Sequence, residues 1–270
     1  MLTPRGHTVA GVMNGILYVA GGFVRPTGAV ATLEAYDPVA NTWTAKAPMP
    51  TARYGAVGGV VNGVLYVAGG MAGDSTTVDA YDPATNTWTT KLATMHSWHG
   101  AAAGAVLNGI LYIAGGHDQN NSRILASVEA YDPATNTWTA KAPMPVPIEY
   151  GAASAVNGIL YVVGGGVIAA YDPASNSWTM KTPQPNEGNI AVAGVLNDTL
   201  YVVGGWIGET ATVLATVEAY DPVGNTWTTR APMPTPRYGA AAGVVNGILH
   251  VAGGFDHNGS LLPAVEAYQR

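Results

Sequence analysis

The sequence contains no cysteine in its 270 residues. This absence excludes disulfides, thiolate metal sites, iron–sulfur clusters and cysteine nucleophiles. Charged residues are also scarce, at 10% of the chain, and the formal net charge of −6 comes without any block of basic residues. Nucleic acid is therefore not expected as a partner, because binding to phosphates relies on clustered lysine and arginine. No apolar run approaches about 18 residues, so we expect no membrane-spanning helix.

Glycine and proline, in contrast, are frequent. The chain has 35 glycines and 18 prolines. Such a content is common in disordered chains, but 48% of the residues are hydrophobic, which favours a packed core. We therefore expect the glycines and prolines to separate many short strands.

A unit of 40 to 50 residues recurs along the chain. Its first marker is a tyrosine, found at Tyr36, Tyr81, Tyr131, Tyr171, Tyr220 and Tyr268, and all but the last begin Tyr-Asp-Pro. A tryptophan follows seven residues after each of the first five, at Trp43, Trp88, Trp138, Trp178 and Trp227. A Gly-Gly pair closes an apolar run in all six units. Repeats of this length with several strands each indicate a propeller or an array.

Residues 53–91 show how one unit divides into four strands. GAVGGVV predicts a tightly packed inner strand (A), and the Asn62-Gly63 pair after it is a strong hairpin signal, because both turn residues need a positive φ. VLYVAGG is a continuous apolar run typical of a buried strand (B), and TVDAYDP alternates as a third strand (C). After an Asp-Pro turn, TWTTK forms the outer strand (D), with Trp88 as its packing anchor.

Applied to the whole chain, this pattern predicts six A, six B, six C and five D strands, because only two residues follow Tyr268. The predicted fold is all-β: one domain, 1–270, forming a six-bladed β-propeller of four-stranded antiparallel blades, the sixth lacking its outer strand. The approximate blade bounds are 1–47, 48–92, 93–142, 143–182, 183–231 and 232–270. We expect packing between blades six and one to close the ring, and residues 265–268 to form an open edge through which copies self-associate.

The double glycine after LYV-type strands, the tyrosine of YDP and the tryptophan of NTW resemble the kelch repeat, over essentially the whole chain. The resemblance implies a β-propeller with strands A to D running from the axis to the rim. It does not imply one function, because kelch propellers include substrate-recruiting adaptors, actin binders, sialic acid mutarotases and galactose oxidase-like enzymes. The copper site of the last group needs a cysteine-linked tyrosine, which this chain cannot form.

The two faces of the predicted propeller differ in how uniform they are. The A–B and C–D turns share one face and are nearly identical in every repeat. The B–C loops and D–A connections share the opposite face and differ from blade to blade. Divergence of this kind is typical of a binding surface, but it is equally typical of tolerated drift.

The D–A connections lead into the innermost strands, so their residues should surround the mouth of the central channel. The candidate ligand-binding residues there are His7, Tyr54, Trp98, His99, Tyr150, Tyr238, Arg5, Arg53, Arg237 and Glu149. Polar groups among aromatic side chains suit an acidic peptide, a sugar acid or a carbohydrate. Trp206 lies outside the repeat pattern and is a further candidate for an exposed anchor.

For the three arginines a structural role is favoured. Each repeat that carries such an arginine also has an acid on strand C, at Glu34, Asp79 and Glu266. The alignment places Glu149 at the arginine position of the fourth repeat and Ala169 at its acid position, which fits a pair lost as a unit. The fifth repeat keeps Glu218 without an obvious arginine.

The sequence contains no recognisable motif for catalysis or metal binding. The six histidines form no HExxH pattern, and no GxSxG or phosphate-binding glycine loop occurs. We therefore predict no catalytic residue, no metal and no cofactor. Glu149 and Glu187 are the one pair that would serve as general acid and base in a mutarotase-like reaction.

We predict a non-enzymatic binding propeller that holds a peptide, a protein loop or a glycan at the channel mouth. One alternative is a carbohydrate-active enzyme resembling a sugar-acid mutarotase. Another is a recently amplified or consensus-like scaffold with no dedicated ligand, since YDPATNTWT is repeated without change at Tyr81 and Tyr131. No feature predicts a compartment.

Overall fold

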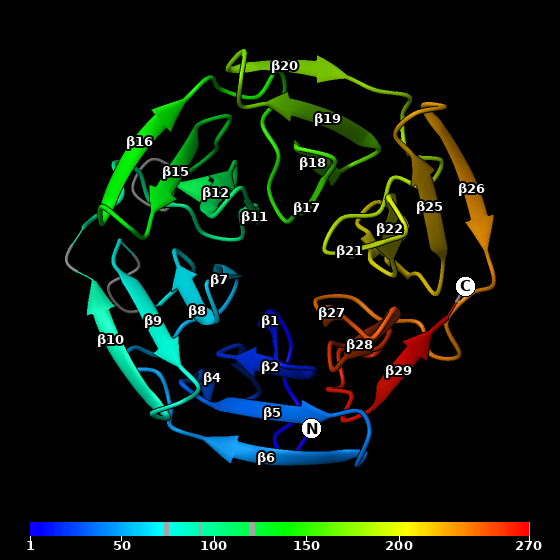
Figure 1. Ribbon diagram of the computed structural model, residues 1–270. Coiled ribbons are helices and arrows are strands. Elements are labelled where there is room, and N and C mark those ends of the chain that lie inside the picture. The colour runs from blue at the N-terminus through cyan, green and yellow to red at the C-terminus, as the bar shows by residue number, and fades with distance from the viewer. Residues whose placement is uncertain (73–75, 92, 119–121, 270) are drawn as a thin grey trace.

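The computed structural model describes residues 1–72, 76–91, 93–118 and 122–269. These residues form strands and no helix, and so no helix that could cross a membrane. Five four-stranded antiparallel sheets and one three-stranded sheet surround a central axis (Figure 1). The prediction of a six-bladed all-β propeller with a three-stranded sixth blade is confirmed. Blades are numbered one to six in chain order below.

The A strands line the axis and are rich in glycine and alanine. They are β1 (Val9–Met13), β7 (Val57–Val61), β11 (Ala103–Leu107), β17 (Ala152–Val156), β21 (Val192–Leu196) and β27 (Ala241–Val245). Six strands converge here, so side chains must be small: a Cβ on Gly58 would lie 2.3 Å from Cγ1 of Val9 in the preceding blade. The Asn-Gly turns have the expected positive φ, for example 50° at Asn62 and 77° at Gly63.

The B strands follow these turns and are buried almost throughout, as expected from their continuous apolar runs. They are β2 (Ile16–Ala20), β8 (Val64–Ala68), β12 (Ile110–Ala114), β18 (Ile159–Gly164), β22 (Thr199–Val203) and β28 (Ile248–Ala252). In blades one, two, three, five and six the Gly-Gly pairs end them with positive φ, for example 61° at Gly21 and 113° at Gly22. This conformation brings Gly22 N–H within 2.9 Å of the Arg53 carbonyl of the next blade.

The C strands are β5 (Leu33–Asp37), β9 (Val78–Asp82), β15 (Val128–Asp132), β19 (Val167–Asp172), β25 (Val217–Asp221) and β29 (Val265–Tyr268). The D strands at the rim are β6 (Thr42–Lys46), β10 (Thr87–Lys91), β16 (Thr137–Lys141), β20 (Ser177–Met180) and β26 (Thr226–Arg230). Each repeat tyrosine of blades one to five pairs with its tryptophan across strands C and D, as Tyr81 does with Trp88. Blade six ends at β29, which is its outermost strand (Figure 1).

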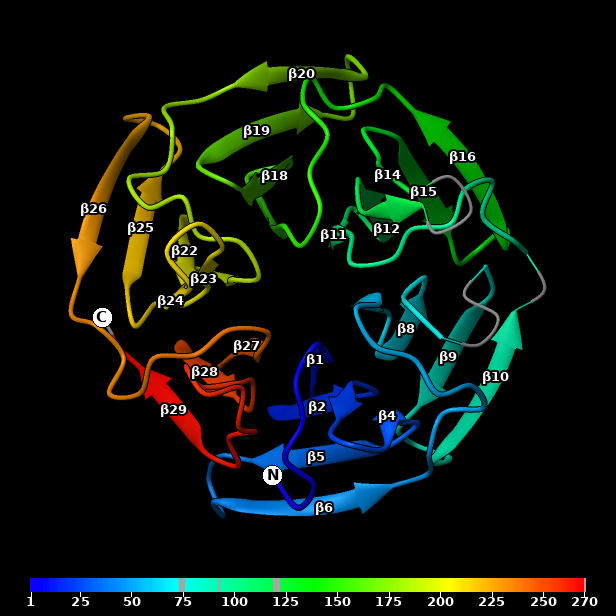
Figure 2. The same cartoon turned by 180° about the vertical axis from the view of Figure 1, so that it is seen from behind.

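Three B–C loops contain a short hairpin that the repeat pattern did not predict. These are β3 (Phe23–Val24) with β4 (Gly28–Ala29), β13 (His117–Asp118) with β14 (Arg123–Ile124), and β23 (Trp206–Ile207) with β24 (Thr212–Val213). They lie on the face seen in Figure 2. Residues 73–75 and 119–121, which belong to two of the divergent loops, lie outside the described residues.

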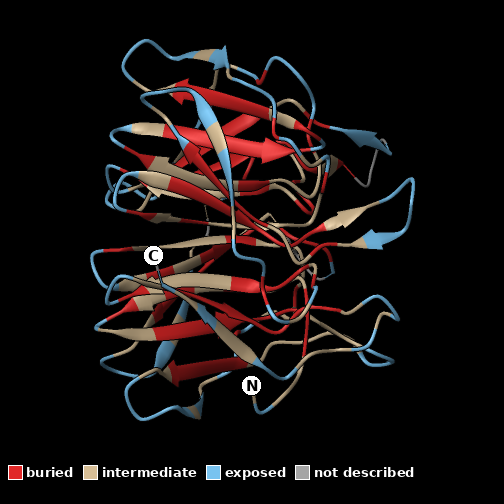
Figure 3. Cartoon of the chain, turned by 90° about the vertical axis from the view of Figure 1, so that its right-hand side faces the viewer, coloured by how far each residue is buried: buried red, intermediate tan, exposed pale blue. Residues whose placement is uncertain are grey.

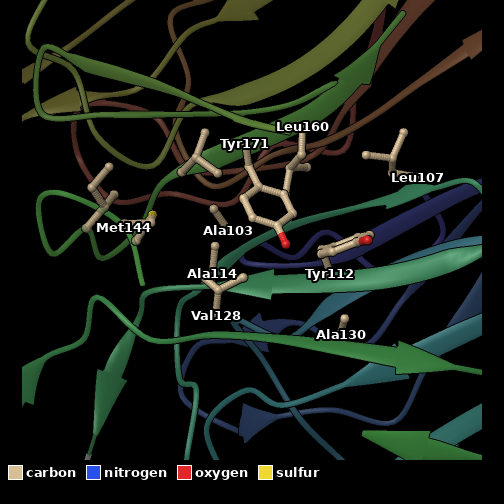
Figure 4. Close-up of a cluster of buried hydrophobic side chains, with 11 residues drawn as sticks. Ala103, Leu107, Tyr112, Ala114, Val128, Ala130, Met144, Leu160 and Tyr171 are labelled. Atoms are coloured by element: carbon tan, nitrogen blue, oxygen red, sulfur yellow. The ribbon is translucent and has the colours of Figure 1, made fainter. Parts of the chain in front are cut away.

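The core lies between blades rather than within one of them. One cluster joins Tyr112, Val128 and Ala130 of blade three to Leu160 and Tyr171 of blade four (Figure 4). Viewed from the side, buried strands fill the middle of the molecule and the exposed turns lie at its two faces (Figure 3). Because each blade covers only part of its apolar surface alone, stability depends on neighbouring blades.

Blades six and one close the ring by packing, as predicted. Leu17 and Val19 of blade one form a buried cluster with Val245 and Ala252 of blade six, and Trp43 and Val265 pack against its margin. Backbone hydrogen bonds join the same two blades, from Gly254 N–H to the Arg5 carbonyl at 3.1 Å and from His7 N–H to the Gly239 carbonyl at 2.7 Å. Side-chain packing and backbone hydrogen bonds thus join blades six and one among the described residues.

Candidate functional site

The D–A segments meet in a closed ring of backbone hydrogen bonds around the axis. One residue of each segment takes a left-handed conformation, with φ between 51° and 61°. Its N–H donates to the equivalent carbonyl of the preceding blade at 2.7 to 2.9 Å, and the six residues of this mouth ring are His7, Gly55, Ala101, Tyr150, Ile190 and Gly239. Because the ring is closed, the backbone at the mouth is held by all six blades together.

Below the mouth ring, a central channel of about 350 Å³ is lined by the ring and by the A strands. Its lining is mostly glycine, alanine and valine, with Thr8, Tyr150 and Ser154 as the hydroxyl-bearing residues. A channel of such walls offers few polar groups for recognition, so specificity must come from the side chains at its mouth.

His7 is the centre of an aromatic group at this mouth. Its ring centroid lies 6.3 Å from Tyr54, 6.0 Å from Tyr150, 6.3 Å from Tyr238 and 5.3 Å from Phe255. Blades one and four lie on opposite sides of the axis, so His7 and Tyr150 meet across it. These five residues are called the mouth cluster below.

The mouth cluster extends outward along the strand-B ends. The Phe23 ring lies 5.2 Å from Tyr54, and the Trp206 ring 6.1 Å from Tyr238. Tyr238 stacks on Phe255 at 5.2 Å, and the Arg25 guanidinium lies over the same phenylalanine. The sequence interpretation did not include Phe23, Phe255 or Arg25. The two phenylalanines could have been found from the sequence because each directly follows a Gly-Gly pair. In the structure, an isolated β-bridge joins each of them to a residue of a D–A segment.

Burial keeps the centre of the mouth cluster uncharged. It lowers the pKa of His7 to about 4, so the imidazole is neutral at pH 7. Burial, with smaller effects from Glu149 and Tyr54, also raises the pKa of Tyr150 above its usual 10. The two groups that meet over the axis are therefore a neutral imidazole and a neutral phenol, which favour uncharged ligands over anions.

The arginines predicted at the mouth lie beneath it. Arg5, Arg53 and Arg237 are at most 1% exposed, and each forms the expected ion pair with the strand-C acid of its own blade. Each guanidinium also donates to the carbonyl of the first glycine of a Gly-Gly pair, as Arg53 does to Gly69 at 3.2 Å. The predicted ion pairs are confirmed, and all three side chains are enclosed.

Blade three has His99 in place of the arginine, and this residue is also buried rather than exposed at the mouth. Its Nδ1 lies 2.6 Å from the Gly115 carbonyl and its Nε2 lies 3.2 Å from Glu129, the same two kinds of acceptor that Arg53 meets. Glu129 accepts further hydrogen bonds from the backbone N–H and the ring of His96. His99 thus meets the same kinds of acceptor as the arginines do, and its role in ligand binding stays a prediction.

In blade five, side-chain amides take the place of the arginine on the strand-C acid. Gln184 and Asn186 each donate to one carboxylate oxygen of Glu218 at 2.7 Å. Burial nevertheless raises the pKa of Glu218, since neutral amides compensate a buried charge less well than a cation does. The two amides thus supply the hydrogen-bond donors for the buried Glu218 carboxyl in the absence of an arginine.

In blade four the sequence alignment was wrong by one residue. Gly116 N–H donates to the Ile148 carbonyl at 2.7 Å, as Gly22 N–H does to Arg53, so Ile148 takes the arginine position. Glu149 consequently takes the place of Tyr54, and Tyr150 is a member of the mouth ring. Ala169 does occupy the acid position, opposite Val162. Blade four therefore has an apolar pair where blades one, two and six have an arginine–carboxylate ion pair.

Trp98 and the two acids are less well placed than expected. Trp98 donates from Nε1 to the Gly70 carbonyl at 3.0 Å, and among the described residues it has no ring contact with the mouth cluster. Glu149 is half-buried beside Tyr150, whereas Glu187 is exposed, and no contact joins them in the described part of the chain. Across the described ranges no three His, Asp or Glu side chains gather as a metal site would require.

The buried carboxyl groups of Glu129 and Glu218 predict opposite responses to pH. Hydrogen bonds from His99 and His96 outweigh the effect of burial and lower the pKa of Glu129 to about 2, against an ordinary value of 4.5. A carboxyl with a lowered folded-state pKa stabilises the fold above its unfolded pKa and loses that effect as the pH falls. Glu129→Gln should therefore cost about 2–3 kcal/mol at pH 7, and less with each step from pH 4.5 towards pH 2.

Urea unfolding of the wild type and Glu129→Gln over this pH range tests the prediction. Glu218→Gln is the matched control, because the pKa of Glu218 is raised and its contribution must become more favourable as the pH falls. Parallel pH dependence in the two variants would contradict the assignment.

The class of protein is thus a six-bladed propeller with a uniform turn face and an aromatic mouth. Residues 2–166 match the model of the KLHDC2/KLHL20/DRC7 Kelch-repeats domain, and residues 191–234 match the Kelch motif. The first match covers more than half of the chain, which therefore belongs to the kelch-repeat family. Kelch propellers generally bind protein partners.

Among solved structures, the chain is similar to one described as "Structure of YjhT". The TM-score is 0.87 at 18% sequence identity, over 99% of this chain and 95% of that one. At this identity the likeness establishes the fold alone. No curated protein sequence matches the chain.

Proposed function

We propose that this propeller is a non-enzymatic binding module that holds an uncharged peptide or protein loop on the mouth cluster. The observation that carries the proposal is the neutral His7 among four aromatic rings, directly over the channel. Tyrosine supplies large contact area at low conformational cost and a hydroxyl for hydrogen bonding, as protein-binding surfaces often require. The family's general role in protein binding supports the same conclusion.

A glycan is the second candidate, because tyrosine and tryptophan faces also stack on sugar rings. Tyr54, Tyr238 and Trp206 lie around the mouth with partly exposed rings and would serve this purpose. The neutral state of His7 and Tyr150 disfavours a sugar acid or an acidic peptide in either case.

The test is selection of binders with a randomised peptide library and, in parallel, a glycan array. Tyr54→Ala together with Tyr238→Ala should weaken a selected peptide at least tenfold, since each ring supplies about 1–2 kcal/mol of contact. The melting temperature should change only slightly, because both rings are partly exposed. Val39→Ala and Val223→Ala, on exposed C–D turns of the opposite face, are the controls and should bind as the wild type does. Unchanged affinity in the double variant would overturn the site, and enrichment of glycans alone would favour the second candidate.

A further inference from the structure

Blade four differs from the other five blades in how its strands B and C are joined. Strands β18 and β19 pair as far as Gly164 and Val167, so Gly165 and Gly166 alone form the connection, called the blade four turn below. The corresponding connections of the other blades are residues 21–32, 69–77, 115–127, 204–216 and 253–264. These five longer connections are called the loop wall.

The loop wall stands on both sides of blade four but not over it. The hairpins β13–β14 and β23–β24 belong to the neighbouring blades three and five, and they lie on either side of the blade four turn (Figure 2). Seen from the side, exposed hairpins extend beyond the blades at one face (Figure 3). A ligand chain that lies on the mouth cluster can therefore continue over blade four without meeting a loop.

The surface of the blade four turn is bare backbone. Gly165 and Gly166 have positive φ values of 59° and 77°, which glycine adopts without strain, and they carry no side chain. The side chains that border them come from the segment leading into β21. A Cβ on Gly165 would lie 3.6 Å from Oδ1 of Asn189, and a Cβ on Gly166 would lie 3.2 Å from Cγ of Glu187. A peptide backbone can therefore pass close to the turn between these polar side chains.

Two carboxylates lie along this path. Glu149 is half-buried next to Tyr150, and its charge adds to the effect of burial in raising the pKa of that phenol, which places the carboxylate beside the mouth cluster. Glu187 is exposed beside Gly166. Neither carboxylate forms an ion pair or a side-chain hydrogen bond with any part of the chain that the structure describes. Free carboxylates next to an uncharged aromatic surface suit a basic side chain of a ligand.

The basic side chains of this face lie at the rim, on the loop wall or across the axis. Lys141 and Lys181 stand at the ends of the outer strands β16 and β20. Arg123 lies on the blade three hairpin, directly across from Asp118. Arg25 is exposed in blade one, opposite blade four, with its guanidinium over a ring of the mouth cluster. The mouth therefore has a positive side at blade one and a negative side at blade four, and such polarity orients a bound chain.

We propose that the mouth cluster and the blade four turn together bind an extended peptide segment in which a lysine or arginine lies close to an aromatic residue. This inference rests on the proposed function and adds a direction to it. The aromatic residue lies on the uncharged mouth cluster, and the basic residue extends over the blade four turn to Glu149 and Glu187. The reverse orientation would bring the ligand's cation to Arg25, which repels it.

The probe is a set of fluorescent hexapeptide pools with blocked ends, each with one tyrosine and one test residue among alanine and serine. The test residue is lysine, glutamine or glutamate, at every position relative to the tyrosine. We expect the best lysine pool to bind the full chain about fivefold more tightly than its glutamine counterpart, the effect of one charge-assisted hydrogen bond, and the glutamate pool to bind least. Equal binding of the lysine and glutamine pools, or a preference for glutamate, would overturn the proposal.

Variants of the chain locate the charge effect. Glu149→Gln together with Glu187→Gln should reduce the preference for lysine over glutamine to less than about twofold. Asp82→Asn together with Asp132→Asn removes the same charge from two C–D turns of the opposite face, keeps an acceptor for their backbone hydrogen bonds and should retain the full preference. A lysine preference that survives the loss of both glutamates, or that falls equally in the two double variants, would overturn the assignment.

A further pair of variants tests the path over blade four. Gly165→Asn suits a φ of 59°, since Asn62 has a φ of 50°, and it places a side chain on the turn. The lysine pool should then bind at least about threefold more weakly. Gly158→Asn is the matched control on the opposite face of the same blade, where an added Cβ meets nothing within 4 Å and where blade five has Asp198 with a φ of 58°. Equal affinities of the two variants would contradict the path.

Binding to Tyr54→Ala with Tyr238→Ala separates this inference from the proposed function. All pools should lose affinity for that double variant, because each depends on the mouth cluster. If they do, and the lysine and glutamine pools nevertheless bind the wild type alike, the proposed function stands and the direction over blade four is wrong. If no pool binds the wild type, both are overturned.

Discussion

Replacement of Arg53 by isoleucine is expected to lower the free energy of unfolding by about 3–5 kcal/mol. The guanidinium is fully enclosed and lies 2.8 Å from Asp79, which is itself buried and accepts a hydrogen bond from the Thr90 hydroxyl. Without Arg53 the Asp79 carboxylate remains in the interior with no cation beside it. Uncompensated burial of a charge, more than the lost contact, sets the size of this effect.

The double variant Arg53→Ile with Asp79→Ala should recover much of the loss and fall within about 1–2 kcal/mol of the wild type. Blade four already has this combination, with Ile148 at the arginine position and Ala169 at the acid position. The fold thus accepts either a complete ion pair or a complete apolar pair at this place.

Urea unfolding of the wild type, the two single variants and the double variant forms the cycle that measures this coupling. Arg123→Ile is the control, because Arg123 is exposed on a B–C loop and its replacement should change stability by less than about 0.5 kcal/mol. A double variant no more stable than Arg53→Ile would show that the pair is required for more than mutual compensation.

Addition of an outer strand to blade six should stabilise the propeller by about 2–4 kcal/mol, the scale of burying a tryptophan and its neighbours less the cost of ordering the segment. The change is the sequence DPVANTWTAKAP after Tyr268, replacing Gln269 and Arg270. It offers β29 the strand that every other C strand has, and it offers Trp43 a carbonyl to bond.

Thermal and urea unfolding measure the gain, and the same extension with alanine for its tryptophan is the control that should give little of it. An extension that does not raise stability would mean that β29 does not accept a strand of this pattern.

Most of the architecture could be predicted because its signals are local. Asn62-Gly63 selects a hairpin turn, and the Tyr81 and Trp88 pair marks strands C and D, without reference to distant residues. Repetition of such signals gave the number of blades and the missing outer strand. The short hairpins β3–β4, β13–β14 and β23–β24 carry no such turn signal and were not predicted.

The candidate site was predicted in part. His7, Tyr54, Tyr150 and Tyr238 do meet at the mouth, because all D–A segments must lead to the axis. The arginines and His99 lie below it, since a long polar side chain in a packed connection is enclosed by the blade it crosses. The pairing of Arg5, Arg53 and Arg237 with strand-C acids could be predicted, because each repeat that has one of these arginines also has an acid on strand C.

By itself, the sequence determined the kind and order of the strands, the number of blades and the charge partners of the arginines, because each depends on residues close in the repeat. Only the tertiary structure decided the ring of hydrogen bonds through His7 and Tyr150, the neutral state of His7 and the one-residue shift that gives Ile148 the arginine position in blade four. These features arise where six blades converge on one axis. There the distances between residues far apart in the chain, and the exclusion of water by their packing, fix what each side chain can do.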